Sequence, residues 1–199
     1  MAARHFTKAE ARAAAQGGTR KYAAESAEII LGSVHAKTRD SETFDIFLSH
    51  SIADAELVLG VKKLLEQEGA TVYVDWNHDR QLDRSKVNAE TAALLRQRMR
   101  QSKSLIYLAT DAASTSKWMP WELGFFDGYR PGGVAIMPVL DRETDGFAGQ
   151  EYLGLYPRVT KDNYQNSATS DVFVEDLGRW TTLKSFRAGT PKWQSYSPS

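Results

Sequence analysis

The fold is decided by the stretch Ser104-Leu105-Ile106-Tyr107-Leu108-Ala109-Thr110, which is followed closely by Ser116-Lys117-Trp118-Met119-Pro120-Trp121-Glu122-Leu123-Gly124. The first part is an apolar run with the length of a buried strand. In the second part, Ser116 has the hydroxyl that a helix N-cap uses, and Pro120 falls in the first turn, where a missing N–H costs little. A strand that leads into a helix is the repeating unit of a parallel α/β sheet.

Glu122 lies near the amino end of this predicted helix, at the carboxyl edge of the strands, where parallel α/β folds place their sites. Trp118 precedes it by four residues, so one helical face carries both side chains. An aromatic ring beside an acid suits a ligand with a flat cationic ring. The same spacing is compatible with Trp118 and Trp121 as core residues and with Glu122 as a surface acid that interacts with the helix dipole.

Apolar runs and amphipathic segments alternate along the middle of the chain. The predicted strands are Phe44–Ser49, Thr71–Trp76, Ser104–Thr110 and Val134–Leu140, and the predicted helices are Asp54–Glu68, Val87–Gln101 and Ser116–Tyr129. This alternation predicts an α/β fold with a central parallel sheet covered by helices on both faces. A closing helix is predicted over Asp171–Phe186, because Phe173, Leu177 and Trp180 fall on one helical face.

The two ends of the chain differ from this pattern. Residues 1–42 are predicted to form an N-terminal helical extension, with one helix over Lys8–Gln16 and a second from about Arg20 to Ser33. The alternative for this segment is a partly disordered leader. Residues 43–189 are predicted to form the α/β domain, and residues 190–199 a flexible tail.

Composition excludes several classes of function. Lys+Arg and Asp+Glu both number 25, which argues against a general nucleic-acid binder. The chain has 0 cysteines and 4 scattered histidines, so we expect neither a disulfide framework nor a metal site. No apolar run approaches the roughly 18–20 residues of a membrane span, and no secretory leader is visible. We therefore expect a cytoplasmic protein that does not bind membranes.

Two motifs, in order and on matching elements, resemble those of Toll/interleukin-1 receptor (TIR) domains. Phe44–Ser49 resembles their first strand, and Ser116-x-Trp118-x-x-x-Glu122-Leu123 resembles the helix motif that carries their catalytic glutamate. The resemblance covers roughly residues 43–140 and implies a flavodoxin-like fold. In catalytic members it implies cleavage of the nicotinamide–ribose bond of NAD⁺, with ADP-ribose or a cyclic ADP-ribose as product. Bacterial members of this size often act in antiphage defence of the Thoeris kind, where the product signals to a separate effector.

The resemblance assigns roles to individual positions. Glu122 matches the catalytic glutamate, and Trp118 matches the aromatic residue that often precedes it. The other positions that match the rim of the substrate pocket are Ser49 and His50 after the first strand and Asp75 and Trp76 after the second. NAD⁺ is the substrate, and no further cofactor is implied. A neighbouring subunit often completes the pocket in this family, so a homo-oligomer is expected.

One loop departs from the family pattern. Many TIR domains have a Pro-Gly step after the second strand, where this chain has Leu82-Asp83-Arg84-Ser85. Arg84 is a candidate contact for the pyrophosphate, because a guanidinium suits phosphate oxygens. Since this loop shapes both the pocket and the contacts between subunits, its sequence leaves the mode of assembly and the product open.

A single glutamate is chemically sufficient for NAD⁺ cleavage. Nicotinamide leaves as a neutral molecule, so no general acid is needed, and the charge that develops on the ribose resembles that in glycoside cleavage. One fixed carboxylate stabilises that charge. Two other functions remain open at this point: a non-catalytic TIR scaffold that acts by homotypic assembly, and an enzyme similar to nucleoside deoxyribosyltransferases, which use a glutamate on a glycosidic bond.

Overall fold

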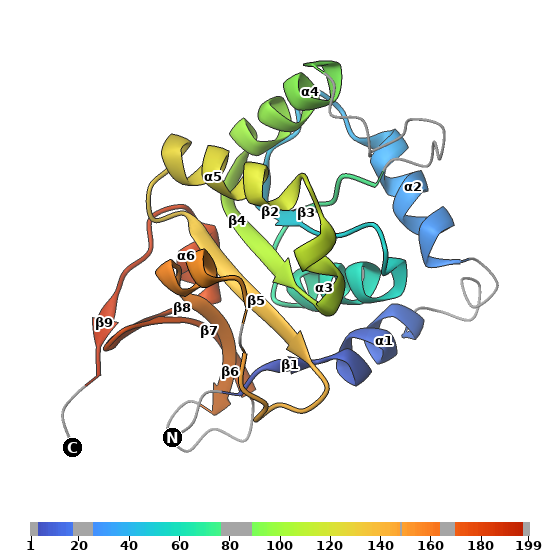
Figure 1. Cartoon of the computed structure of the whole chain (residues 1–199). Coiled ribbons are helices and arrows are strands. Elements are labelled where there is room, and N and C mark those ends of the chain that lie inside the picture. Colours follow the sequence, from blue (N-terminus) through green and yellow to red (C-terminus); the bar gives the residue numbers. More distant parts are fainter. Residues whose placement is uncertain (1–3, 18–25, 77–88, 148, 164–169, 197–199) are drawn as a thin grey trace.

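The computed structural model describes residues 4–17, 26–76, 89–147, 149–163 and 170–196, and its centre is a mostly parallel sheet (Figure 1). The strands lie in the order β3-β2-β4-β5-β6-β7-β8-β9. The parallel part consists of β3 (Val72–Tyr73), β2 (Phe44–Ser49), β4 (Ser102–Ala109), β5 (Val134–Leu140) and β6 (Arg158–Asn163). The α/β fold class is thereby confirmed.

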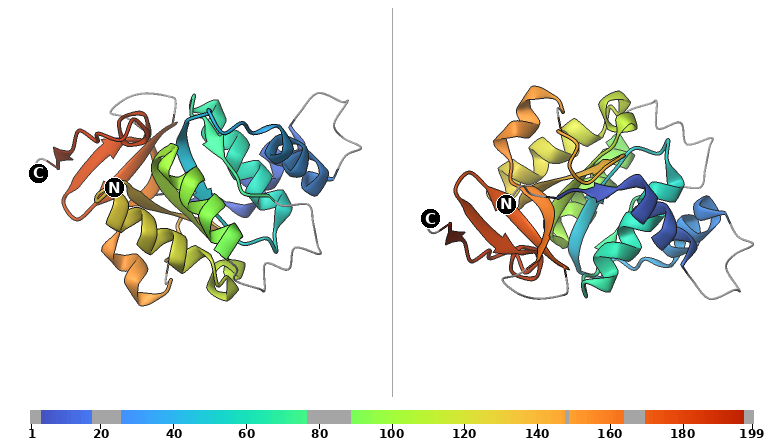
Figure 2. Two further views of the ribbon diagram at one scale, coloured as in Figure 1. Left: turned by 90° about the horizontal axis from the view of Figure 1, so that it is seen from above. Right: turned by 90° about the horizontal axis from the view of Figure 1, so that it is seen from below.

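Helices cover both faces of the sheet (Figure 2). One face packs against α1 (Lys8–Gln16), α2 (Ala27–Lys37), α3 (Ala55–Gln67) and α6 (Leu183–Arg187), and the other against α4 (Ala89–Arg100) and α5 (Met119–Tyr129). Apolar side chains along β2 and β4 point alternately to the two faces of the sheet and so enter two separate cores. The helix predicted from Asp54 is present, with the Asp54 carboxylate capping the N–H of Leu57 at 3.3 Å and Gly69 beyond its end at φ 77°.

The predicted closing helix over 171–186 is wrong. This segment forms an antiparallel hairpin of β7 (Ser170–Asp176) and β8 (Arg179–Thr182), followed by α6 and by β9 (Gln194–Ser195). Gly178 has φ 73° and allows the tight turn, while Leu177 beside it is 96% exposed rather than part of an apolar face. Phe173 and Trp180 do lie near each other, edge to face at 5.4 Å, but from neighbouring strands. The helical spacing was therefore coincidental.

The start of α5 also differs from the prediction. The helix begins at Met119, and Trp118 rather than Ser116 occupies the N-cap position. The Ser116 hydroxyl still accepts a hydrogen bond from the Met119 N–H at 3.3 Å, and Pro120 lies in the first turn as predicted. A short helix, η1 (Asp111–Thr115), fills the space between β4 and this point.

The N-terminal segment takes part in the sheet. Phe6–Thr7 forms β1, which pairs in parallel with the end of β5, and α1 follows with a complete capping box between Thr7 and Glu10. Helix α1 packs so closely on α3 that a Cβ on Gly60 would lie 1.8 Å from the Ala11 carbonyl oxygen. The division of the chain at residues 42 and 189 stays a prediction. Within the described residues, no helix has the length and apolar character that a membrane crossing requires.

Candidate active site

Glu122 is the centre of the candidate site. It lies in the first turn of α5 and is 3% exposed, although it is an acid. Ser49, the last residue of β2, is fully buried, and its hydroxyl donates a hydrogen bond to Glu122 Oε2 at 2.5 Å. A short hydrogen bond of this kind is typical of a donor to a charged oxygen. The end of a central strand therefore fixes the position of a buried carboxylate at a helix amino terminus.

A backbone hydrogen bond connects Trp118 and Glu122 at the start of α5. The Glu122 N–H donates to the Trp118 carbonyl at 2.8 Å, so both residues are fixed by the first helical hydrogen bond. The Trp118 ring is buried and meets Trp121 edge to face at 5.5 Å. Trp121 in turn stacks on Phe125, with 5.9 Å between the ring centres, so it has the packing role with which its spacing is compatible.

His50 and Trp76, two more of the predicted rim residues, lie against each other in the structure. Their rings stack at 5.6 Å with an angle of 15° between the planes, and both are buried. The His50 Nδ1–H donates to the Leu48 carbonyl at 2.8 Å, which fixes the ring orientation. Asp75 is buried as well, with its Oδ1 3.5 Å from the Tyr73 hydroxyl. Arg84 lies outside the described residues, so its predicted contact with a pyrophosphate stays a prediction.

Tyr107 is a site residue that the sequence analysis missed. It is paired with Ser49 in the β2–β4 ladder, so both side chains lie on the face of the sheet that α5 covers. Its ring is fully buried, and its hydroxyl lies near that of Tyr152. Burial raises the pKa of Tyr107, and the nearby Tyr152 and the Glu122 carboxylate raise it further. The phenol therefore stays protonated, within electrostatic range of the Glu122 carboxylate. The available signal was a polar atom inside an otherwise apolar strand.

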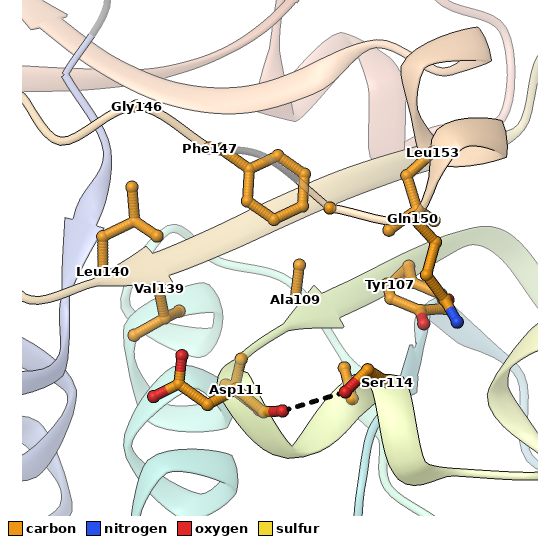
Figure 3. A pocket seen from close by; sticks show the side chains of 13 residues that line it. Tyr107, Ala109, Asp111, Ser114, Val139, Leu140, Gly146, Phe147, Gln150 and Leu153 are labelled. Carbon is orange, nitrogen blue, oxygen red and sulfur yellow. Dashed lines mark hydrogen bonds between the residues drawn. The ribbon is translucent and has the colours of Figure 1, made fainter.

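Tyr107 also lines a cleft of about 540 Å³ at the carboxyl ends of β4 and β5 (Figure 3). Its lining includes Tyr107 and Ala109 from β4, Asp111 and Ser114 from η1, and Phe147, Gln150 and Leu153 from the segment after β5. The cleft has the size of a small-molecule site, for which roughly 300–1,000 Å³ is usual. Among the described residues, no cluster of three or more histidine, aspartate or glutamate side chains is arranged to hold a metal ion.

Comparisons with known proteins agree with the fold. The family model described as "TIR domain" matches residues 46–168. The protein named "Probable 3' cyclic ADP-D-ribose synthase ThsB'" from Bacillus cereus (strain MSX-D12) is 47% identical over 151 residues, which cover 75% of this chain and 78% of that protein. The protein named "Putative cyclic ADP-D-ribose synthase TIR2" from Cytobacillus dafuensis is 27% identical over 117 residues, which cover 55% of this chain and 31% of that protein. The chain belongs to the TIR domain family.

Proposed function

We propose that this protein is an NAD⁺-cleaving enzyme of the TIR type, which breaks the nicotinamide–ribose bond and forms a cyclic ADP-ribose as a signal in antiphage defence. The buried contact between Ser49 and Glu122 is the observation that carries the proposal, because it fixes a carboxylate at the sheet edge where α/β folds bind ligands. The two named relatives support the choice of reaction, since both names describe a cyclic ADP-D-ribose synthase.

The chemistry needs little more than this carboxylate. The C–N bond breaks with its electron pair on nicotinamide, and positive charge develops on the ribose. Glu122 stabilises that charge, and Ser49 holds the carboxylate in place as the charge forms. The vacated carbon then bonds to an atom of the adenosine half, which closes the ring, or to water, which gives linear ADP-ribose; a proton is lost to solvent when the attacking atom is a hydroxyl or water oxygen.

The proposal includes roles for the aromatic residues. Trp118 lies one helical turn before Glu122 and offers a ring to the pyridinium. His50 and Trp76, stacked on each other at the ends of β2 and β3, form the opposite side of the pocket together with Asp75. Each of these substrate contacts is part of the proposal.

Replacing Glu122 by glutamine tests this function. Preorganised electrostatic contacts are typically worth about 3–4 kcal/mol, so we expect nicotinamide release to fall by about 10²–10³ in Glu122→Gln. The matched control is Glu90→Gln, because Glu90 also lies in the first turn of a helix but is exposed. Nicotinamide release from NAD⁺ is followed by chromatography, and mass spectrometry identifies the product. A folded Glu122→Gln protein with full activity contradicts the proposal.

The same assay separates the alternatives. A non-catalytic TIR scaffold releases no nicotinamide at any protein concentration, whereas an enzyme that depends on assembly becomes more active per molecule as concentration rises. We propose such assembly between copies, a separate effector that senses the product, and a location in the cytoplasm. Sedimentation of the active protein tests the first of these.

A further inference from the structure

The cleft at the ends of β4 and β5 contains none of the residues to which the proposed function gives a role. Tyr107 is the residue that connects the cleft with the Glu122 site: it lines the cleft, its ladder partner Ser49 binds Glu122, and its phenol lies in the electrostatic field of that carboxylate. The cleft therefore begins on the β4–β5 side of Glu122. His50 and Trp76 lie on the other side, at the ends of β2 and β3.

A cyclic product places a strict demand on how NAD⁺ binds. The ring closes only if an atom of the adenosine half reaches the ribose carbon that nicotinamide leaves. An extended NAD⁺ keeps these two atoms far apart, so the bound molecule has to fold back on itself. The folded adenosine half then needs a space directly beside Glu122.

We propose that the cleft between the ends of β4 and β5 binds the adenosine half of NAD⁺ within the same subunit, and so determines whether the product is cyclic or linear. The inference rests on the proposed function. Its physical basis is that the cleft is of ligand size and shares the buried Tyr107 with the Glu122 site. Tyr107 lines the cleft and is the ladder partner of Ser49, so it marks the place where the cleft and the Glu122 site meet.

The lining suits an adenosine. In Figure 3 the half-buried Phe147 ring points into the space above Ala109, where it offers one face to a purine. Asp111 and Ser114 lie across from it, and both side chains are exposed. The Ser114 hydroxyl donates to the Asp111 backbone carbonyl at 3.2 Å. The Asp111 carboxylate is suited to accept a hydrogen bond from a ribose hydroxyl, as the acid does in dinucleotide-binding sheets.

The N-terminal segment holds this rim in place. The Lys8 ammonium, in the first turn of α1, forms ion pairs with Asp111 at 2.7 Å and with Asp141 at 3.1 Å. It thereby connects the residues that follow β4 and β5 across the edge of the cleft. The hydrogen bond to Asp111, together with that to Asp141, raises the pKa of Lys8.

Gly146 provides a direct steric test. It lines the cleft, its φ is not in the left-handed region, and a Cβ built on it meets nothing within 4 Å. Gly146→Leu therefore adds volume to the cleft without a clash in the protein. Gly128→Leu is the matched control, because Gly128 is equally open but lies on α5 outside the cleft. Phe147→Ala is the second variant, which removes the stacking face.

The readouts are KM for NAD⁺, kcat for nicotinamide release, and the ratio of cyclic to linear ADP-ribose. We expect Phe147→Ala to raise KM about tenfold, as one lost stacking contact implies, and Gly146→Leu to raise it at least as much, because the added side chain fills part of the cleft. Both variants are expected to shift the product towards linear ADP-ribose. Gly128→Leu is expected to match the wild type. Thermal unfolding of each variant shows whether it is folded.

The outcomes distinguish this inference from the proposed function. If the wild type releases no nicotinamide, the proposed function fails. If it releases nicotinamide but folded Gly146→Leu and Phe147→Ala keep the wild-type KM and product ratio, the cleft does not bind adenosine and the inference is overturned. A wild type that releases nicotinamide but forms only linear ADP-ribose overturns the inference together with the cyclic product of the proposed function, and leaves only NAD⁺ cleavage in place.

Discussion

Removing the Ser49 hydroxyl is the sharpest test of how the candidate site works. The hydroxyl lies 2.5 Å from Glu122 Oε2, and both residues are buried, so no solvent competes for the contact. Hydrogen bonds to charged groups contribute about 1.5–3 kcal/mol. Because about 1.4 kcal/mol corresponds to tenfold in rate, Ser49→Ala is expected to lower kcat for nicotinamide release by roughly 10- to 150-fold. KM should change little, since the hydroxyl contacts the protein rather than the substrate.

Loss of a buried hydroxyl also affects stability, and the control has to separate the two effects. Ser104 is equally buried on the neighbouring strand β4, where its hydroxyl donates to the Asp45 carbonyl at 2.8 Å. Ser104→Ala therefore loses the hydrogen bond of one buried hydroxyl, and that hydroxyl does not contact Glu122. We expect both variants to unfold at a lower temperature, but only Ser49→Ala to lose activity. Equal kcat values for the two folded variants would refute the idea that Ser49 positions the carboxylate.

Two further predictions concern stability. Gly60→Ala forces a Cβ against the Ala11 carbonyl and should lower the free energy of unfolding by about 2 kcal/mol or more. A loss of about this size lowers the melting temperature by roughly 4–8 °C. The control is Gly124→Ala, which adds a Cβ in open space on α5 and should cause no loss of stability. Burial alone raises the pKa of Asp45. The hydrogen bond from Lys103 and the contacts with other nearby groups together lower it by more, so its folded pKa is below the ordinary value. Asp45 therefore contributes stability above the unfolded pKa of about 3.9 that is lost as pH falls through the folded pKa. Denaturant unfolding between pH 6 and pH 2, about the range where aspartate titrates, should show a shallower acid loss in Asp45→Asn, and an unchanged slope would contradict this.

The parts of the fold that follow from local signals were predictable. The predicted strand Val134–Leu140 coincides with β5, and Lys8–Gln16 coincides with α1. In both cases the segment's own composition and periodicity determine its structure. The segment 171–186 was not predictable in the same way, because Phe173 and Trp180 have a spacing that fits both a helix and a hairpin. The signal that favoured the hairpin was Gly178, which turns the chain between two runs that contain β-branched and aromatic residues.

The same distinction applies to the site. Glu122 and Trp118 belong to one strand–helix unit, and Ser49 ends the strand beside it, so a short motif and the rule for parallel sheets were enough to bring them together. The cleft is different. Its lining combines residues of β4 and η1 with Phe147 and Leu153, whose placement depends on how the chain returns after β5.

The two parts of the site come from regions of the fold that tolerate substitution to different degrees. The carboxylate and its serine are fixed by the central strands, which any change of product has to keep. The cleft is formed by η1 and by the segment after β5, and its rim is held by Lys8 from the N-terminal segment. Loops and chain ends tolerate substitution far better than central strands. Under the proposed function and the inferred role of the cleft, bond cleavage therefore resides in the rigid part of the molecule, whereas the choice between cyclic and linear product resides in the part that can change without disturbing the sheet.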